Sequence, residues 1–369
     1  MSTCAVDTSW KEVSTYCNNL EQGVLRATGA LLEGVAIFGA GPYGETAYRY
    51  LKKIGANIVC FVDNDLHKQG TLLEGIQVVS PREFSGLAAK VVFIAARHAV
   101  LPVRRQLEEM EILGVSFDAF FVVNNIDRIR NVRDQLLGDD RSRLIFDGIL
   151  KAMLTGDESF CASIMEGNQY FALPEFVNIG TDFFVDAGAY VGDTVEKFIW
   201  TQNGVFNQIH AFEPGEPQFK ALSARKERLV KEWAVDDSKI VCVHAGLAEE
   251  DKQMQISLDS QMLQCTSFGS SRGSKGTMIS LRSLDKYLGG SPATFIKADI
   301  EGMEMVMLRG AERTIRKFRP RMALSIYHEP TDLFEIAEYV RSIVPEYQMA
   351  IRHHAPSLMD SVLYCWIKQ

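Results

Sequence analysis

The sequence predicts an α/β protein made of two units, a smaller first one and a larger second one, each built on a mainly parallel sheet. The chain has 369 residues, which suits two domains better than one. Two glycine-rich turns, at residues 39–44 and 186–192, each follow an apolar strand and open a helical segment. After each turn, apolar strands alternate with helical segments. This alternation is typical of a parallel sheet with crossover helices.

The first unit is expected to follow a helical segment over residues 1–30. Its elements are then predicted in the order strand 35–38, helix 43–54, strand 58–62 and strand 91–94. In the helix, Ala47, Leu51 and Ile54 recur at helical spacing and form one apolar face. Such a face indicates a helix that packs on a sheet.

Residues 125–169 are predicted to connect the two units. This segment has a helical pattern, is rich in charge, and contains no strand pattern. The sequence therefore divides into a Rossmann-like unit of nucleotide or nucleotide-sugar type at 1–124, a helical connector at 125–169, and the second unit at 170–369.

Seven strands are predicted in the second unit, near 182–186, 209–213, 239–245, 294–299, 322–328, 347–353 and 361–367. The last two are joined only by Ala355-Pro-Ser-Leu-Met-Asp360, which is too short for a parallel crossover, so we expect that pair to be antiparallel. A polar loop at 267–276 is interpreted either as a hairpin connection or as a lid over an acidic substrate.

Composition and charge argue against several classes of protein. Hydrophobic residues make up 47% of the chain and charged residues 23%, as in globular proteins. The formal net charge of −8 argues against a nucleic-acid or anionic-membrane surface. No stretch reaches the ~18–20 apolar residues that span a bilayer, and no signal-peptide pattern is seen. The seven cysteines are scattered without a CxxC pair. We therefore expect a cytoplasmic protein without nucleic-acid or membrane partners.

The turn at 186–192 is typical of a nucleotide-type ligand site. It has the pattern D-x-G-x-x-x-G, whereas pyrophosphate sites have G-x-G-x-x-G. Glycines let a ligand approach the backbone, and the following helix offers free N–H groups. The next strand ends in Glu213, a carboxylate suited to the two hydroxyls of a ribose. A ligand with a ribose but no phosphate fits this pattern best, which indicates S-adenosyl-L-methionine as the cofactor.

Six stretches of the second unit occur in the order found in one enzyme family. They are Gln169-Tyr-Phe171, FVDAGAYVGDT (184–194), AFEPGEPQF (211–219), IKADIEGMEMVMLRGAERTI (296–315), SIYHEPTDLFEI (325–336) and IRHHAPSLMDSVLY (351–364). With these stretches, slightly over half of the chain resembles the FkbM-family S-adenosylmethionine-dependent methyltransferases. The resemblance implies a class I, seven-stranded Rossmann-like fold and O-methylation of a sugar or related hydroxylated small molecule.

The cofactor site is predicted at the ends of the first three strands of the second unit. Its expected residues are Asp186, Gly188, Ala189, Tyr190, Gly192, Asp193, Thr194, Glu213, Pro214 and Gly246. The alternative is that the glycines only permit a tight turn and that Glu213 is a surface carboxylate.

Catalytic residues are expected where the fourth and fifth strands end. Methyl transfer requires alignment of a hydroxyl with the methyl group and removal of its proton. Asp299 and Glu301 lie at the fourth strand's end, although Glu301 also suits the first turn of a helix. A neutral His328 could act as general base, with His353 and His354 at the same edge. Because nothing fixes the distances between these groups, no metal is predicted.

The first unit carries a separate fingerprint, Gly39-Ala-Gly41-Pro-Tyr-Gly44, with Asp63 at the end of the next strand. This pattern is typical of dinucleotide sites. It resembles small Rossmann-like domains that precede sugar-modifying enzymes. Three interpretations stay open: a nucleotide or nucleotide-sugar site, a vestigial docking domain, or an NAD site.

The sequence thus favours an O-methyltransferase whose acceptor is a carbohydrate or glycosylated small molecule, with a sugar or nucleotide sugar as partner and possible homo-oligomers. One alternative is an NAD(P)-dependent oxidoreductase that acts on a nucleotide sugar. Another is a non-catalytic protein that binds a nucleotide and S-adenosylmethionine.

Overall fold

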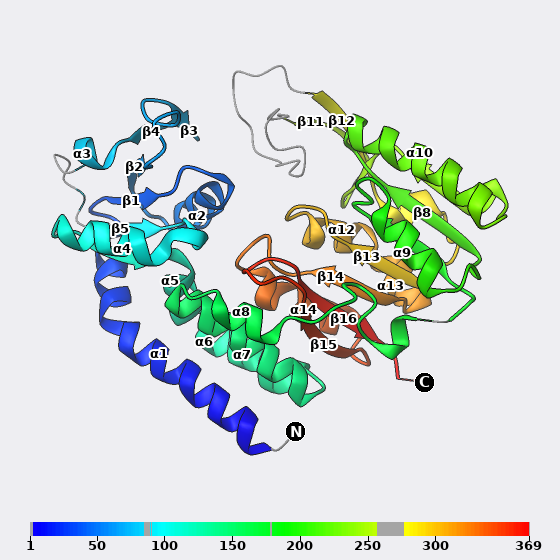
Figure 1. The fold of residues 1–369 in the computed structure, drawn as a ribbon, viewed down its shortest axis with the longest axis horizontal. Helices are drawn as coiled ribbons and strands as arrows, with labels where there is room; N and C mark the ends of the chain where they lie inside the picture. Colours follow the sequence, from blue (N-terminus) through cyan, green and yellow to red (C-terminus); the bar gives the residue numbers. More distant parts are fainter. Residues whose placement is uncertain (1–2, 85–88, 90, 178, 257–276, 369) are drawn as a thin grey trace. The chain divides into compact units, whose positions relative to one another are not determined.

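The computed structural model describes residues 3–84, 89, 91–177, 179–256 and 277–368, and these form two compact units (Figure 1). Unit 1 contains Met1–Arg133, Asp140–Met165 and Ala355–Leu358. Unit 2 contains Asp134–Asp139, Glu166–His354 and Met359–Gln369. The predicted polar loop at 267–276 lies outside the described residues.

Unit 1 is built on a six-stranded sheet of order β3-β4-β2-β1-β5-β6, in which the β3–β4 pair is antiparallel and the other pairs are parallel. Its strands are β1 (Val35–Phe38), β2 (Ile58–Val62), β3 (Leu72–Leu73), β4 (Ile76–Val79), β5 (Val91–Ile94) and β6 (Leu113–Ser116). Its helices are α1 (Thr3–Ala30), α2 (Pro42–Lys53), α3 (Pro81–Phe84), α4 (Val100–Glu109), α5 (Phe117–Asn124), α6 (Ile126–Asn131), α7 (Asp140–Thr155) and α8 (Ser159–Ile164). The predicted strands and the first two helices are therefore present.

The segment predicted as a connector at 125–169 is helical, but most of it packs into unit 1. Helix α7 lies along α1 and α5. A buried ion pair joins Arg133 Nε to Asp147 Oδ1 at 2.6 Å, and Arg133 also donates to the carbonyl of Val6. Charged residues in this segment thus hold buried helix contacts, where the sequence pattern indicated a helical connector between the two units. The structural boundary of unit 1 lies near Met165, with residues 134–139 assigned to unit 2.

Unit 2 is built on a seven-stranded sheet of order β15-β16-β14-β13-β7-β8-β9. Its strands are β7 (Phe183–Ala187), β8 (Gln208–Phe212), β9 (Ile240–Val243), β13 (Phe295–Ala298), β14 (Arg321–Ser325), β15 (Gln348–His353) and β16 (Ser361–Trp366). Strand β16 is antiparallel to both neighbours and the other pairs are parallel, which confirms the predicted antiparallel final pair. This is the class I arrangement that the family resemblance implied.

Helices and a small second sheet complete unit 2. The helices are α9 (Asp193–Thr201), α10 (Glu216–Glu232), α11 (Leu284–Leu288), α12 (Glu304–Gly310), α13 (Glu312–Phe318) and α14 (Asp332–Ile343). The small sheet, which the sequence did not predict, contains β10 (Gly246–Leu247), β11 (Lys252–Ile256) and β12 (Thr277–Arg282). Strand β14 ends three residues before His328, so that histidine lies in the following loop and not on the strand as expected.

An aromatic core fixes the first crossover helix against the sheet of unit 2. The Phe184 ring from β7 stacks on Phe198 from α9, with ring centroids 4.3 Å apart, and Phe295 from β13 packs against both. All three side chains are buried. Burial of a phenylalanine contributes about 1.5–3 kcal/mol, so this cluster holds the turn between β7 and α9 firmly in place.

Among the described residues, no helix is both long and apolar enough to cross a membrane.

Candidate active site

A cavity of about 270 Å³ lies at the carboxyl edge of the unit 2 sheet, where open α/β sheets bind ligands. The predicted residues that line it are Gly188, Tyr190, Asp193, Thr194, Glu213, Pro214, Gly246, Asp299 and Glu301. Those that do not line it are Asp186, Ala189, Gly192 and His328. We call the side of the cavity formed by the turn and Glu213 the cofactor part, and the side around Asp299 the acceptor part, after the roles that the sequence predicts for these residues.

The turn after β7 needs its glycines for reasons of backbone geometry. Gly188 has φ +79°, and a Cβ there would lie 1.9 Å from the carbonyl oxygen of Asp299. Gly192 has φ +84°, and its Cβ would lie 2.9 Å from Leu222 Cδ1. The sequence interpretation was that both glycines make room for a ligand. In the structure, Gly188 lets two loops approach each other, and Gly192 begins α9 against α10.

Glu213 follows β8 and is 6% exposed. Its Oε2 accepts a hydrogen bond from the Tyr190 N–H at 2.9 Å, and its Oε1 accepts one from the Gly215 N–H at 2.7 Å. Burial raises the pKa of Glu213 to about 7, although these two hydrogen bonds act in the opposite direction. Each carboxylate oxygen can accept a further hydrogen bond, so Glu213 can still bind two hydroxyl groups.

Asp186 stabilises the turn through Lys297 and does not line the cavity. It is fully buried and pairs with Lys297 Nζ at 3.0 Å, and the same Nζ donates to the carbonyl of Gly188 at 2.7 Å. Although burial lowers the pKa of Lys297, the carboxylates of Asp186 and Asp299 raise it above its ordinary value. The charged lysine therefore joins β7, the turn and β13, and Asp186 holds the turn without lining the cavity.

Asp299 is held in place by two phenols in the acceptor part. Tyr170 donates to its Oδ2 at 2.7 Å, and Tyr327 donates to its Oδ1 at 3.1 Å. Burial raises the pKa of Asp299, but Lys297, His328 and the hydrogen bond from Tyr170 lower it below its ordinary value. An oriented carboxylate that stays ionised is a poor proton acceptor, so its geometry favours positioning over the role of base.

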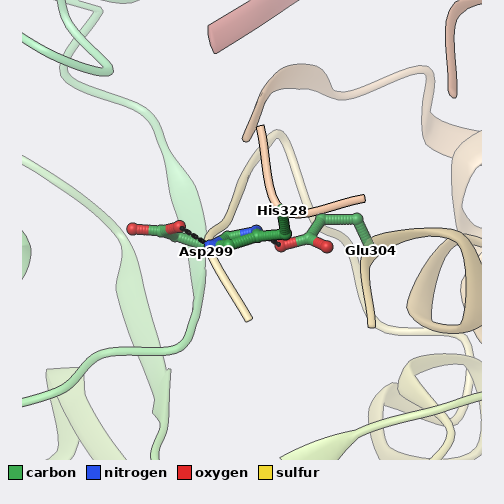
Figure 2. A group of neighbouring side chains, drawn as sticks. All are labelled: Asp299, Glu304 and His328. Atoms are coloured by element: carbon green, nitrogen blue, oxygen red, sulfur yellow. Dashed lines mark hydrogen bonds and ion pairs between the residues drawn. The ribbon is translucent and has the colours of Figure 1, made fainter. Parts of the chain in front are cut away.

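His328 lies between carboxylates, as Figure 2 shows for Asp299 and Glu304. Its Nδ1 is 3.0 Å from Glu304 Oε1, and its Nε2 is 3.5 Å from Asp299 Oδ1 and 3.7 Å from Glu301 Oε2. Burial lowers the pKa of His328, but Glu304, Asp299 and Glu301 together raise it to about 10. The expectation of a neutral imidazole base is therefore wrong, because a ring surrounded by carboxylates keeps its proton at neutral pH.

The other two histidines of that edge also do not line the cavity. His353 is buried, with Nδ1 2.8 Å from Ser361 Oγ. His354 Nδ1 is 2.9 Å from the carbonyl oxygen of Glu166, and its Nε2 is 3.1 Å from the Tyr364 hydroxyl. Both histidines therefore take part in packing and loop hydrogen bonds.

Sequence reasoning missed several residues that line the cavity, namely Gln169, Tyr170, Gln218, Leu247, Lys297, Ile300, Met303 and Asp360. Asp360 is the most informative of them. Its pKa is raised by burial and by Asp299, and it lies in the loop between β15 and β16. The end of β15 was predicted at the ligand-binding edge, so that loop was a recognisable place to look for a carboxylate.

The turn at residues 39–44 of unit 1 has the backbone geometry that its glycine pattern predicts. Gly39 has φ +112°, and a Cβ on Gly44 would lie 1.9 Å from the carbonyl oxygen of Gly39, so helix α2 needs glycine there. Gly41 is the residue that precedes α2. Asp63 Oδ2 accepts from the Ala40 N–H at 2.8 Å and from Lys68 Nζ at 3.2 Å. Asp63 thus stabilises the turn itself, and a second nucleotide site remains a prediction.

Comparison with protein families gives a match in each unit. Residues 186–349 match the family described as the methyltransferase FkbM domain. Residues 32–116 match the family described as C2185-like, N-terminal. The comparison with curated proteins finds no match.

Three solved structures illustrate what this chain is similar to. The methyltransferase FkbM from Methylobacillus flagellatus KT is 22% identical, with a TM-score of 0.60, over 98% of this chain and 100% of that chain. Fibrillarin from Aeropyrum pernix, in complex with S-adenosyl-L-methionine, is 12% identical with a TM-score of 0.32, over 53% of this chain and 70% of that chain. UDP-D-quinovosamine 4-dehydrogenase from Vibrio fischeri is 22% identical with a TM-score of 0.20, over 22% of this chain and 74% of that chain. The first of these matches shows a common fold along nearly the whole chain.

Proposed function

We propose that this chain, whose residues 186–349 match the methyltransferase FkbM domain, is an S-adenosyl-L-methionine-dependent O-methyltransferase. Its acceptor is a hydroxyl of a carbohydrate or glycosylated small molecule. The observation that carries the proposal is the joining of two parts in one cavity: a turn that suits a ribose without a pyrophosphate, and a set of carboxylates that suits hydroxyl groups.

The cofactor part has the groups that an S-adenosyl ligand needs. Glu213 keeps acceptor positions for both ribose hydroxyls after its bonds to the backbone. Pro214, Gly246 and Leu247 give the cavity an apolar surface beside it, suited to an adenine ring. A nicotinamide dinucleotide is disfavoured here, since the turn lacks the glycine pattern that accommodates a pyrophosphate.

The acceptor part is lined by the carboxylates of Asp299, Glu301 and Asp360. Carboxylates accept hydrogen bonds from hydroxyl groups and repel phosphate groups at the same distances. We therefore favour a sugar that is uncharged where it enters the cavity. In a nucleotide sugar, the diphosphate would have to stay outside the acceptor part.

The reaction is an in-line displacement at the methyl carbon of the sulfonium. A bond forms between the acceptor oxygen and the methyl carbon, the carbon–sulfur bond breaks, and its electron pair stays on sulfur to give S-adenosylhomocysteine. The hydroxyl proton passes to a carboxylate. Glu301 and Asp360 are the candidates, because both line the cavity and burial raises the pKa of each.

A panel of acceptors tests this function directly. The full chain is incubated with methyl-labelled S-adenosylmethionine and with neutral sugars, amino sugars, sugar phosphates or nucleotide sugars, and label in the product is measured. We expect transfer to a hydroxyl of a neutral sugar or an amino sugar, with sugar phosphates as poorer acceptors. Transfer only to nitrogen, to sulfur or to nucleic acid would overturn it.

A further inference from the structure

Four ionisable side chains lie close together beside the acceptor part of the cavity, namely Asp299, Glu301, Glu304 and His328, and the first two of them line it. Of these, His328 is 9% exposed, and its Nε2 is buried without a hydrogen-bond partner. This nitrogen faces Asp299 Oδ1 at 3.5 Å and Glu301 Oε2 at 3.7 Å. While it is protonated, this nitrogen forms ion pairs with both carboxylates, and once it loses its proton it offers a lone pair to a ligand.

The distances suit a metal ion. Bonds of about 2.1 Å to nitrogen and oxygen place neighbouring ligand atoms about 3 Å apart and opposite ones about 4 Å apart. The two separations at His328 Nε2 fall within that range. Among the described residues, the group whose possible ligand atoms all lie within 4.8 Å of one another is Asp299, Glu304 and His328, so Glu301 would have to turn toward Asp299 for the two carboxylates to share an ion.

The surrounding hydrogen bonds are those expected around metal ligands. Glu304 Oε1 lies 3.0 Å from His328 Nδ1, on the side of the ring away from Asp299 (Figure 2). The same oxygen accepts the Ile300 N–H at 2.8 Å, so Glu304 is held in place by the loop. Ligating histidines commonly donate their second N–H to a carboxylate, and ligating carboxylates are commonly hydrogen-bonded. Tyr170 and Tyr327 provide those hydrogen bonds to Asp299.

We propose that His328 Nε2, Asp299 and Glu301 bind a divalent first-row transition-metal ion, with Glu304 holding the imidazole from its other nitrogen. One imidazole and two carboxylates suit Mn²⁺ or Fe²⁺ better than Mg²⁺, which takes mainly oxygen ligands. Asp299 and Glu301 both line the cavity, so the ion would be reachable from it. This placement, which rests on the proposed function, puts the ion next to the acceptor hydroxyl and leaves Asp360 as the carboxylate that takes the proton.

Metal binding is tested without any methyl donor, so its outcome is independent of the methyltransferase proposal. The full chain is treated with a chelator and titrated with Mn²⁺ by calorimetry, and the bound ion is examined by pulsed electron paramagnetic resonance. We expect one Mn²⁺ per chain and a coupling from an imidazole nitrogen. We expect Glu301→Gln and Glu304→Gln to weaken binding about 10–100-fold, and His328→Gln to remove the nitrogen coupling.

Asp193→Asn is the matched control, because Asp193 lines the same cavity on its cofactor side. Its affinity for Mn²⁺ should stay within about twofold of wild type. Equal losses in Asp193→Asn and Glu301→Gln would show attraction by the general negative charge of the cavity and would overturn the site. Absence of binding, or of the nitrogen coupling in wild type, would also overturn it. Should His328→Gln fail to fold, Glu301→Gln still allows the test, because the Glu301 side chain is 36% exposed and its replacement should be tolerated.

Discussion

The hydroxyl of Tyr170 donates a 2.7 Å hydrogen bond to Asp299 Oδ2, although 129 residues separate the two in sequence. The bond joins the segment before the first strand of unit 2 to the loop after its fourth strand. It therefore fixes the acceptor carboxylate from outside the sheet.

Tyr170→Phe removes this hydrogen bond and leaves the ring in place. We expect it to lower the free energy of unfolding by about 1 kcal/mol, because Asp299 is partly exposed and water can replace the lost donor. Turnover on a sugar acceptor should fall more than affinity for S-adenosylhomocysteine. Tyr327→Phe, which removes the longer bond of 3.1 Å, should have the smaller effect of the two. A larger loss of cofactor affinity than of turnover would contradict this assignment.

Gly188→Ala should destabilise the turn strongly. The new Cβ would lie 1.9 Å from the carbonyl oxygen of Asp299, at a φ of +79° that alanine rarely adopts. Gly289→Ala is the matched control, since its φ is +56° and no atom lies within 4 Å of the added Cβ. We expect a loss of about 1 kcal/mol in the control from backbone strain alone, and several kcal/mol at Gly188. Equal melting temperatures for the two variants would show that the two loops separate without cost.

Glu213 should make stability depend on pH. Its pKa is about 7 in the folded chain, compared with an ordinary value of 4.5. The unfolded chain therefore releases this proton at lower pH than the folded chain. The stabilisation is complete below about pH 4.5 and is lost as the pH rises to about 7.

Glu213→Gln replaces the titrating carboxyl group with an amide that does not titrate in this pH range. Relative to that of wild type, its free energy of unfolding should rise by about 2–3 kcal/mol between pH 5 and pH 8, because only wild type loses the stabilisation from the protonated carboxyl group. Denaturant unfolding at both pH values measures the change. Glu216→Gln is the control, because Glu216 is exposed and its pKa is lowered by Lys220. The same pH dependence in wild type and Glu213→Gln would contradict the buried environment of this carboxylate.

Two cavity carboxylates can be separated by their response to metal. Asp360→Asn should lower turnover about 10²–10⁴-fold, as the loss of a general base does, and added Mn²⁺ should not restore it. Glu301→Gln should also lower turnover, but excess Mn²⁺ should restore part of it. Steady-state rates at increasing Mn²⁺ measure both responses. Near-native turnover in Asp360→Asn would show that another group accepts the proton of the acceptor hydroxyl.

The seven strands of the large sheet in unit 2, strands β1, β2 and β5 of unit 1, and the turn at 186–192 could be predicted because they depend on local pattern. Each strand is a short apolar run, and the turn at 186–192 has its signal within seven residues. The acceptor part depends on contacts between distant segments. Tyr170, Glu304 and Asp360 come from three parts of the chain, and no local pattern relates them.

His328 shows the same limit for charge. Its position near the ligand edge was foreseen, but its protonation depends on Glu304, which is 24 residues away. The segment at 125–169 shows that packing is equally hard to predict from sequence. Its charged residues include the buried Arg133–Asp147 pair, which no local pattern indicates. A sequence pattern predicts that charged residues are exposed, because most of them are. Which of them are buried against a partner becomes clear only from the fold.

The most direct test of the proposed cofactor site is the affinity of the full chain for S-adenosylhomocysteine, measured by calorimetry in wild type and in two matched variants. Glu213→Ala removes the expected ribose carboxylate, and Asp63→Ala removes the corresponding carboxylate of the first-unit turn. We expect one binding site, with an affinity that Glu213→Ala lowers at least tenfold, or about 1.4 kcal/mol, and that Asp63→Ala leaves unchanged. No binding to wild type, or equal affinities in wild type and a folded Glu213→Ala variant, would contradict it.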